Sequence, residues 1–164
     1  MKDIPVIRGR QYIAGLVAEG EHQRQDFKFL IPDACKIARS VSAFANTDGG
    51  RLLIGVKDNG TVAGVRNEED IYVVEQAAQR YCRPAVQVDF TAFRVEHDLV
   101  VIRASIPAVE NRPVECRDHD GTWRAFVRVA DENIAAHPLM IRGWKNPPYG
   151  PVAYDSTLRA VLNL

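Results

Sequence analysis

Hydrophobic and polar positions change their period several times along the chain, and each change marks the start of a new expected element. Residues 7–19 carry apolar side chains at helical spacing and are followed by a glycine, which predicts a first helix. Residues 24–30 alternate polar with apolar side chains, which is the period of a half-buried strand. The polar side of that strand carries Arg24, Asp26 and Lys28.

A second helix is expected after Asp33, because an apolar stripe recurs at helical spacing as far as Ala45. The pair Gly49 and Gly50 is expected to supply the positive φ angles for a sharp turn out of this helix. Residues 52–56 are nearly continuous in apolar side chains, which is typical of a strand inside a sheet. The Asp-Asn-Gly triplet that soon follows predicts a tight hairpin turn.

The next part of the chain contains one more helical pattern and two β-rich segments. A third helix is predicted to begin at Asn67, whose side chain suits a helix cap, and to end before Pro84. Two hairpins are predicted over residues 85–106 and 114–129. We therefore expect an α+β domain over residues 1–136, with three helices and about six strands in one mixed sheet.

The final segment, residues 137–164, has a different composition. Its stretch 146–151 contains three prolines and a glycine, which excludes a helix there and favours an extended strap. Residues 156–164 cluster their apolar side chains, so we expect a short amphipathic segment that docks on the body or on a second subunit.

Composition limits the class of protein. The 164 residues include 46% hydrophobic and 26% charged side chains, which is ordinary for one soluble globular domain. Three widely spaced cysteines argue against a disulfide framework, and the first residues lack the apolar run of a signal peptide. No stretch approaches the roughly 18 continuous apolar residues of a membrane span. We therefore expect a cytoplasmic protein without membrane contacts.

The charge balance excludes a broad electrostatic role. Lys plus Arg equals Asp plus Glu, with 21 of each, so the chain as a whole has no strong field that attracts phosphate backbones. Any nucleic-acid site must therefore be a local patch.

A candidate catalytic and metal site lies on the polar side of the first expected strand. Asp26 and Lys28 share that side, Glu21 precedes the strand, and Asp58 lies in the hairpin turn. Three carboxylates around one point are suited to Mg²⁺ or Mn²⁺, which would activate water at a phosphodiester while the lysine holds the phosphate. The alternatives are a solvated strand face for the first pair and ordinary turn chemistry for Asp58.

A candidate nucleic-acid surface lies on the second hairpin, where alternation places Arg124, Phe126 and Arg128 on one face. Guanidinium groups pair with phosphates, while an aromatic ring stacks on a base. The alternative is an exposed hairpin whose arginines pair with Glu115 across the strands. Further candidate contacts to nucleic acid are Arg24, Lys36, Arg39 and Arg117.

A weaker signal is the spacing Cys116-x-x-His119, which has the form of half a zinc site. A structural zinc site needs four ligands, and no second pair lies nearby in the sequence. We therefore interpret Cys116 as a strand cysteine beside a turn. The chain also lacks the signatures of phosphate-binding loops and of serine hydrolases.

Three sequence blocks, taken in order, connect the chain with a known family. They are EHQRQDFK at 21–28, SAFANTDGG at 42–50 running into IGVKDNG at 54–60, and FVR at 126–128 followed by DENIAA at 131–136. With these blocks the chain resembles the Schlafen-type AlbA-like domain, a family generally described as DNA-binding, from about residue 12 to residue 136.

The resemblance implies an α+β fold with Glu21, Asp26 and Asp58 near a common groove. In Schlafen ribonucleases an acidic trio in the first and middle blocks cleaves tRNA or rRNA with a divalent metal. Two departures bear on catalysis: Asp26 stands where glutamate is usual, and Lys57 precedes Asp58, which shifts the third carboxylate by one residue. Lone AlbA-like lobes often pair, so the resemblance also implies a homodimer.

Three functions are consistent with these observations. The first is a nucleic-acid-binding module that needs no cofactor and takes DNA or RNA as its partner, in transcriptional regulation or defence in a bacterial cytoplasm. The second is an endoribonuclease that uses Mg²⁺ or Mn²⁺ on structured RNA such as tRNA. Its metal ligands would be Glu21, Asp26 and Asp58, with Lys28 on the phosphate. The third is an interaction or nucleotide-sensing domain on the same fold, which the zero net charge leaves open.

Overall fold

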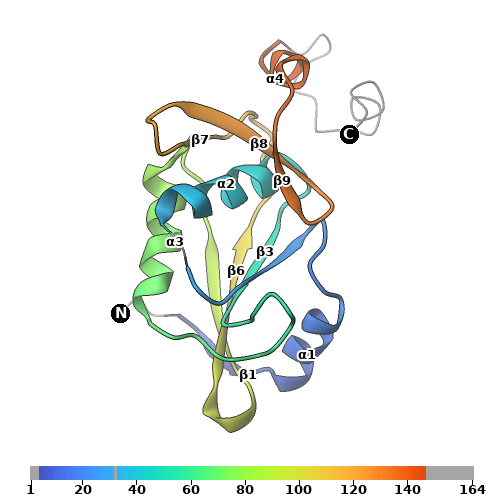
Figure 1. Ribbon diagram of the computed structural model, residues 1–164, viewed down its shortest axis with the longest axis vertical. Helices are drawn as coiled ribbons and strands as arrows, with labels where there is room; N and C mark the ends of the chain where they lie inside the picture. The colour runs from blue at the N-terminus through green and yellow to red at the C-terminus, as the bar shows by residue number, and fades with distance from the viewer. Residues whose placement is uncertain (1–3, 32, 147–164) are drawn as a thin grey trace.

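The computed structural model describes residues 4–31 and 33–146 (Figure 1). Its α-helices are α1 (Arg10–Ala18), α2 (Ala34–Ala45), α3 (Glu69–Arg80) and α4 (Pro138–Lys145). Its strands are β1 (Val6–Arg8), β2 (Gln25–Lys28), β3 (Gly50–Ile54), β4 (Cys82–Arg83), β5 (Asp89–Arg94), β6 (Val100–Ile106), β7 (Glu115–Arg117), β8 (Trp123–Val129) and β9 (Glu132–Ala135).

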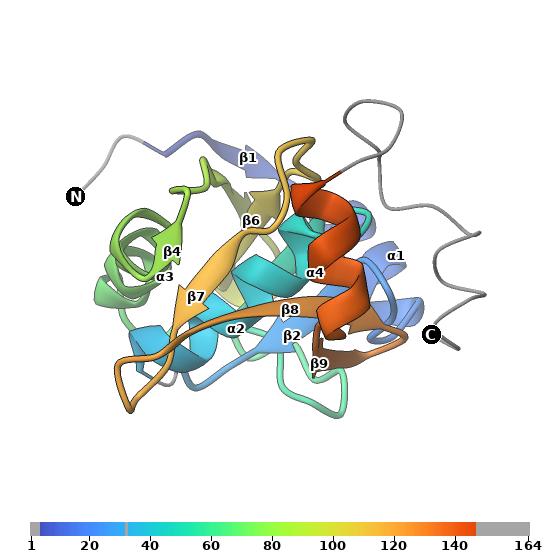
Figure 2. The same cartoon turned by 90° about the horizontal axis from the view of Figure 1, so that it is seen from above.

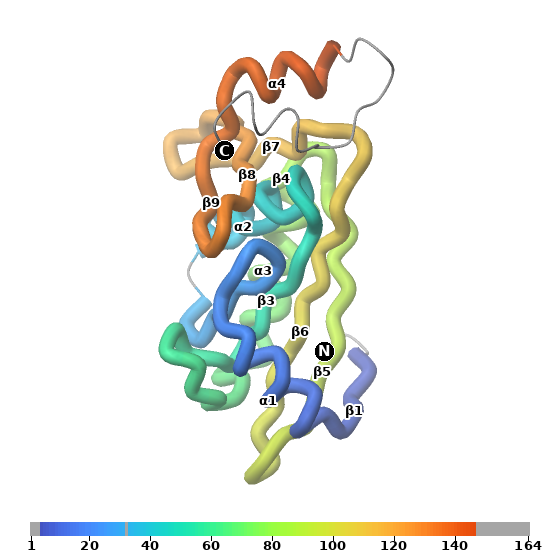
Figure 3. Tube along the Cα trace, turned by 90° about the vertical axis from the view of Figure 1, so that its right-hand side faces the viewer, coloured from blue at the N-terminus to red at the C-terminus, as the bar shows by residue number. Residues whose placement is uncertain are grey.

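The larger sheet has five strands in the order β1-β5-β6-β3-β2. Both edge strands run parallel to their neighbours, and the inner pairs are antiparallel. Figure 3 shows the long β5–β6 hairpin along one side of the molecule, with β1 at its edge. Because side chains alternate across a strand, Leu53 faces α1, whereas Leu52 and Ile102 face α2 and α3. Arg51 and Ser105, farther along the α1 face, line an open depression instead.

The smaller sheet has four antiparallel strands in the order β4-β7-β8-β9. It lies at one end of the molecule against α2, and α4 covers its outer face (Figure 1, Figure 2). The strand β8 contributes to both interfaces, since Phe126 joins the core around α2 while Ala125 and Val127 pack with Met140 and Trp144 of α4. The layers therefore follow the order α1, larger sheet, α2 with α3, smaller sheet, α4.

The α+β class expected from the sequence is confirmed, but the architecture differs in detail. The described residues contain nine strands in two sheets and four α-helices, rather than about six strands in one mixed sheet and three helices. The sequence pattern misses the short strands β1, β4 and β9, which have three, two and four residues.

The end of α2 is tied to the smaller sheet by buried polar side chains. Asn46 Nδ2 donates to the carbonyl oxygens of Val114 and Phe126, each at 2.9 Å, and Asn46 Oδ1 accepts from the Val114 N–H at 2.7 Å. Ser42 Oγ donates to the Val114 carbonyl at 2.7 Å and accepts from the Phe126 N–H at 3.0 Å. Buried polar groups stabilise a fold only when they are satisfied in this way. The middle sequence block thus fixes the smaller sheet on the helix.

The two glycines after α2 have different physical roles. Gly49 has a φ of 70°, as expected for a turn that only glycine adopts readily. Gly50 does not have a positive φ, but a Cβ atom there would lie 2.5 Å from the Phe44 ring. The expectation of a positive φ is therefore right for Gly49 and wrong for Gly50. At position 50 a glycine is needed because the Phe44 ring packs too closely for a Cβ atom.

Helix α4 is an element that the sequence pattern does not predict. His137 Nδ1 accepts from the Leu139 N–H at 3.1 Å as a cap, and Trp144 packs against the smaller sheet. Apart from Asn146, the expected strap at 146–151 lies outside the described residues, as does the expected amphipathic segment at 156–164. Within residues 4–31 and 33–146, no helix combines the length and apolar character needed to cross a membrane.

Candidate functional site

The four residues predicted as catalytic come from three segments that adjoin β2. Asp26 and Lys28 lie on β2, which is the edge strand of the larger sheet and runs parallel to β3. Glu21 lies in the loop before β2, and Asp58 lies in the tight turn after β3. The three carboxylates therefore lie near the β2 edge of the sheet, with Glu21 close enough to interact with both others.

The other two carboxylates affect the pKa of Glu21. Its Oε1 accepts from the Phe27 N–H at 3.0 Å, which holds the side chain against β2. Partial burial raises the pKa of Glu21 above its usual value, and the hydrogen-bonded Asp26 and the charge of Asp58 raise it further against the opposing Phe27 amide. A carboxyl group in such surroundings lies where a cation would be favoured.

Asp26 is already neutralised by two basic side chains. Its Oδ2 lies 2.9 Å from Lys28 Nζ, and its Oδ1 lies 3.4 Å from Arg128 Nη2. Among the residues that the structure describes, the oxygens of Glu21, Asp26 and Asp58 do not all lie within 4.8 Å of one another. The trio is therefore not a preformed site with three direct ligands to one cation.

Two of the predicted nucleic-acid contacts on the second hairpin are wrong, because Phe126 is only 8% exposed and Arg128 only 1%. The guanidinium of Arg128 lies 4.7 Å from the centre of the Phe44 ring, and its Nη2 donates to the carbonyl oxygens of His22 and Gln25, each at 3.2 Å. The face that alternation assigns to solvent is covered, since α2 packs on it. Neither side chain is available to a nucleic acid.

Two other basic residues of that surface pair with acidic side chains in the β7–β8 turn. Arg39 is hydrogen-bonded to Asp118, and this bond lowers the pKa of Asp118. Arg124 lies 3.8 Å from Asp118 and 3.7 Å from Asp120. The alternative of arginines paired with Glu115 is therefore wrong in its partner. Glu115 lies 3.4 Å from Arg83, and the acids that pair here belong to the turn. Arg124 stays exposed despite these pairs, while Lys36 and Arg117 are exposed and make no ion pair in the described part of the chain.

A different surface gathers arginines from three separate segments. An open depression of about 270 Å³ lies beside α1 on the α1 face of the larger sheet. Arg24 enters it from the loop before β2, Arg51 from β3 and Arg103 from β6, and Tyr12 of α1 lines the same depression. We call this depression the arginine pocket.

Arg103 is held in the arginine pocket by neutral groups. Its Nη1 donates to Tyr12 Oη at 2.7 Å, and its Nη2 donates to Thr91 Oγ1 at 3.4 Å. The guanidinium lies 5.2 Å from the centre of the Phe93 ring. Within the described residues Arg103 makes no ion pair with a carboxylate, so its charge is not neutralised there.

The remaining charges of the arginine pocket leave it positive. Arg51 Nε donates to Gln25 Oε1 at 2.8 Å, and Arg51 Nη2 lies 3.5 Å from Glu19. Arg24 is exposed and has no ion pair in the described part of the chain. The carboxylate of Asp89 also lines the pocket. Three guanidinium groups therefore share a small surface with few acidic neighbours.

A comparison with protein families agrees with the blocks that the sequence contains. A family model described as Schlafen, AlbA_2 matches residues 21–137. The chain belongs to the Schlafen AlbA_2 family. The matched region of this AlbA_2 domain includes all three residues of the acidic trio and the buried Arg128. No curated protein matches the chain.

Two solved structures share the fold of the AlbA_2 domain. The DIP2311 protein from Corynebacterium diphtheriae is 23% identical with a TM-score of 0.54, and the similarity covers 76% of this chain and 24% of that one. The second is the N-terminal domain of a Nitrosomonas europaea protein described as related to the ATP-dependent DNA helicase RecG. It is 20% identical with a TM-score of 0.54, over 74% of this chain and 87% of that one. At these identities the likeness shows the fold alone.

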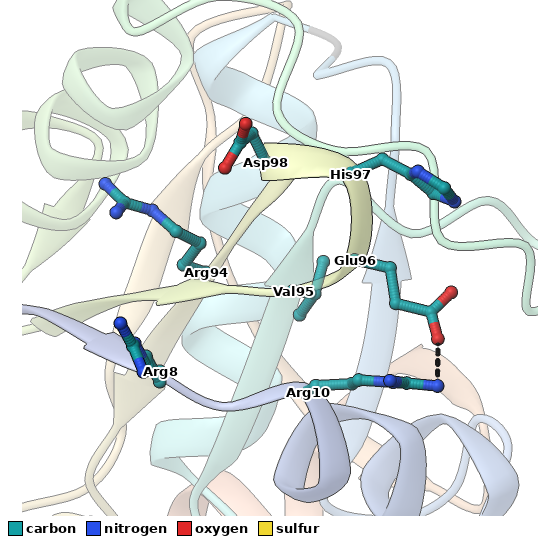
Figure 4. Close-up of a pocket in the computed structure, with 7 residues that line it drawn as sticks. All are labelled: Arg8, Arg10, Arg94, Val95, Glu96, His97 and Asp98. Carbon is teal, nitrogen blue, oxygen red and sulfur yellow. Dashed lines mark ion pairs between the residues drawn. The ribbon is translucent and has the colours of Figure 1, made fainter.

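A further hollow of the AlbA_2 domain has a more balanced charge (Figure 4). It has a volume of about 680 Å³ and lies where β1 meets the β5–β6 hairpin. Arg10 pairs with Glu96 at its rim, and Arg8, Arg94 and Asp98 also line it. This hollow also has three arginines, but two acidic side chains line it, against one in the lining of the arginine pocket.

Sequence reasoning misses three residues of the arginine pocket: Tyr12, Arg51 and Arg103. A signal exists, because Arg103 and Ser105 alternate with apolar residues on the strand that contains them. This alternation becomes informative only when the strand order is known, because β6 pairs with β3, and β2 lies on the other side of β3.

Proposed function

We propose that this AlbA_2 domain binds nucleic acid and that the arginine pocket takes the phosphate backbone. The observation that carries the proposal is the convergence of three guanidinium groups in one open depression of a chain with zero net charge. Local positive charge on an accessible surface is what a phosphate backbone requires.

The chemistry of the arginine pocket suits a single strand. A guanidinium group presents a planar fork of donors that matches two phosphate oxygens. Tyr12 is 42% exposed beside that fork, and its ring already lies 5.0 Å from the Phe93 ring and 5.6 Å from the Arg103 guanidinium, so its exposed part would contact a base. A groove that combines backbone charge with an aromatic platform is typical of surfaces that bind single strands without strong sequence preference.

The name of one similar protein agrees with the same class of partner. The Nitrosomonas europaea neighbour is a domain of a protein related to a DNA helicase, and helicases act on nucleic acid. A regulatory or defence role in a bacterial cytoplasm, exerted by a homodimer, extends this proposal and rests on the family resemblance.

The test is a titration of labelled single-stranded RNA, single-stranded DNA and duplex DNA with the purified chain, at salt concentrations from about 50 to 200 mM. Binding should weaken steeply with salt, with a log–log slope of about −0.7 per phosphate contact on a single strand. Arg103→Gln should weaken binding and make the slope shallower by roughly one contact. The matched control Arg80→Gln changes an exposed arginine on α3 and should leave the affinity and the salt slope unchanged.

Two results would contradict the proposal. Equal affinity and equal salt slope in Arg103→Gln and the unmodified chain would exclude the arginine pocket as the interface. No binding to any of the three nucleic acids would reject the function itself and favour the interaction or nucleotide-sensing domain.

A metal-dependent endoribonuclease is the second candidate, and the raised pKa of Glu21 beside Asp26 and Asp58 favours it. Mg²⁺ is commonly held by one or two carboxylates together with substrate phosphates. Glu21 and Asp58 would hold Mg²⁺ or Mn²⁺, while Lys28 and Arg128 fix Asp26 beside them. The metal would supply charge stabilisation and an activated water at a phosphodiester.

Incubation of tRNA with the chain, with and without Mn²⁺ or Mg²⁺, tests the second candidate. Asp58→Asn is a better variant than Asp26→Asn, because Asp58 is exposed while Asp26 is a buried partner of Arg128. We expect fragments only with metal and only from the unmodified chain, with binding retained in Asp58→Asn. Binding without fragmentation under every metal condition would reject the nuclease and leave the binding function intact.

A further inference from the structure

Three side chains with metal-ligating atoms meet between the start of α2 and the β7–β8 turn. Asp33 caps α2, Cys35 lies in the first turn of that helix, and His119 lies in the β7–β8 turn. The ligand atoms of these three residues all lie within 4.8 Å of one another. Asp33 and His119 are 86 positions apart in the sequence, so tertiary structure alone brings the group together.

Each of the three side chains offers a suitable atom. The two carboxylate oxygens of Asp33 have different partners. Oδ1 accepts from the Lys36 N–H at 3.0 Å, and Oδ2 lies 2.8 Å from His119 Nε2. The helix cap therefore uses Oδ1, while Oδ2 is hydrogen-bonded to His119, and a bound ion would replace this hydrogen bond. Cys35 is a free thiol and is partly exposed, so an ion can reach it from solvent.

The second ring nitrogen of His119 faces another carboxylate. His119 Nδ1 lies 3.7 Å from Asp118 Oδ1, and the same oxygen accepts from the His119 backbone N–H at 3.0 Å. Arg39 donates a hydrogen bond to the same oxygen of Asp118. An imidazole with one nitrogen among potential ligands and the other toward a carboxylate has the orientation that metal-binding histidines use.

We propose that Asp33, Cys35 and His119 bind a zinc ion, with water as the fourth ligand. Thiolate, imidazole and carboxylate together form a donor set that favours zinc over magnesium or calcium. Zinc bonds of about 2.0–2.3 Å place tetrahedral ligand atoms roughly 3–4 Å apart, so small side-chain movements complete the site.

Binding exchanges protons for metal bonds. The Cys35 thiol loses its proton to solvent as the zinc–sulfur bond forms. His119 coordinates through Nε2 as neutral imidazole and keeps its proton on Nδ1, toward Asp118. The ion would tie the first turn of α2 to the β7–β8 turn and so join two layers of the fold.

The Cys116-x-x-His119 spacing thus includes the histidine of the proposed site but not its cysteine. Cys116 is 0% exposed on β7, where it lies opposite Cys82 of β4. Cys35 takes its place in the cluster, although nothing in the local sequence connects it with His119. The zinc site shares no residue with the arginine pocket or the acidic trio, so its failure would leave the proposed function untouched.

The test uses the full chain after treatment with a chelator and its removal. Calorimetry should show one equivalent of Zn²⁺ bound. Co²⁺ in place of Zn²⁺ should give near-ultraviolet sulfur-to-cobalt charge-transfer absorption, which added Zn²⁺ removes. Cys35→Ala and His119→Gln should each weaken Zn²⁺ binding by more than about 100-fold, beyond the effect of losing an outer-shell partner. Asp118→Asn should weaken it by about 10-fold.

His97→Gln is the matched control, because His97 is an exposed histidine in the β5–β6 turn at a distance from the cluster. It should bind Zn²⁺ as the unmodified chain does, and circular dichroism should show each variant to be folded. Absence of stoichiometric Zn²⁺ binding would overturn the proposal. Equal affinity and equal cobalt absorption in Cys35→Ala or His119→Gln would also overturn it.

Discussion

Arginine side chains occupy two contrasting environments on opposite faces of the larger sheet. On the α2 side, Arg128 is 1% exposed and lies against Asp26 and Phe44. On the α1 side, Arg24 and Arg103 reach an open depression and have no ion pair in the described part of the chain. The same residue type is thus structural on one face and available on the other.

The difference lies in what covers each face. The α2 side is covered by two helices, and the smaller sheet packs on α2 beyond them. The α1 side has one helix of nine residues, which leaves the start of β3 and the end of β6 open. Whether an arginine serves stability or binding is therefore decided by the next layer of the fold.

The largest effect is expected from Arg128→Ala. Removing one partner of a buried ion pair leaves the other charge without compensation, which costs about 3–5 kcal/mol. Urea unfolding should show this loss, whereas Arg124→Ala on the exposed hairpin should change stability by less than about 0.5 kcal/mol. A loss below about 1 kcal/mol for Arg128→Ala would remove the basis of the comparison.

Arg24→Glu should have the opposite profile. Because Arg24 is exposed and has no ion pair among the described residues, the substitution should leave the unfolding free energy within about 0.5 kcal/mol of the original. Binding of a single-stranded oligonucleotide should weaken by about 2–3 kcal/mol, since a charged hydrogen bond is replaced by repulsion. Unchanged binding in an anisotropy titration would show that the open arginines are not the interface.

Tyr12→Ala separates stacking from charge. Loss of a stacked base should weaken binding by roughly 1–2 kcal/mol. Tyr12→Phe removes only the hydroxyl that accepts from Arg103, so it should keep most of the affinity. Equal losses in the two variants would assign the effect to the position of Arg103, and no loss in either would exclude Tyr12 from the interface.

Glu21→Gln should produce the smallest change, and only in the dependence of stability on pH. Burial and the neighbouring carboxylates raise the pKa of Glu21 in the folded chain, so its stabilising contribution is full below the ordinary value of 4.5 and is lost as pH rises through the raised pKa. Between about pH 4 and pH 7 the unmodified chain should therefore lose more stability than Glu21→Gln, which keeps an oxygen for the Phe27 amide. Parallel unfolding profiles across that range would show that the carboxylates do not interact.

The sequence predicts those parts of the fold whose pattern is local. The helix that follows Asp33 and the two hairpins over 85–106 and 114–129 correspond to α2, β5–β6 and β7–β8. Each has enough residues for its period to be read, and each is bounded by turn or cap residues.

The errors arise where function depends on which elements pack together. Alternation correctly groups Phe126 with Arg128, but it cannot say that α2 covers their face. Arg51 and Arg103 lie on strands far apart in the sequence, and only the pairing of β3 with β6 brings them to one surface. The acidic trio stays a prediction from the family blocks, whereas the ion pair of Asp26 with Arg128 needs the smaller sheet in place.

The central claim, that the arginine pocket and not the buried Arg128 meets nucleic acid, is tested most directly by nuclear magnetic resonance. The arginine side-chain Nε–Hε signals would be followed while a single-stranded oligonucleotide is added. We predict that the signals of Arg24, Arg51 and Arg103 shift progressively, while that of Arg128 stays in place. Shifts confined to Arg117 and Arg124 on the hairpin, with the pocket signals unchanged, would contradict the claim.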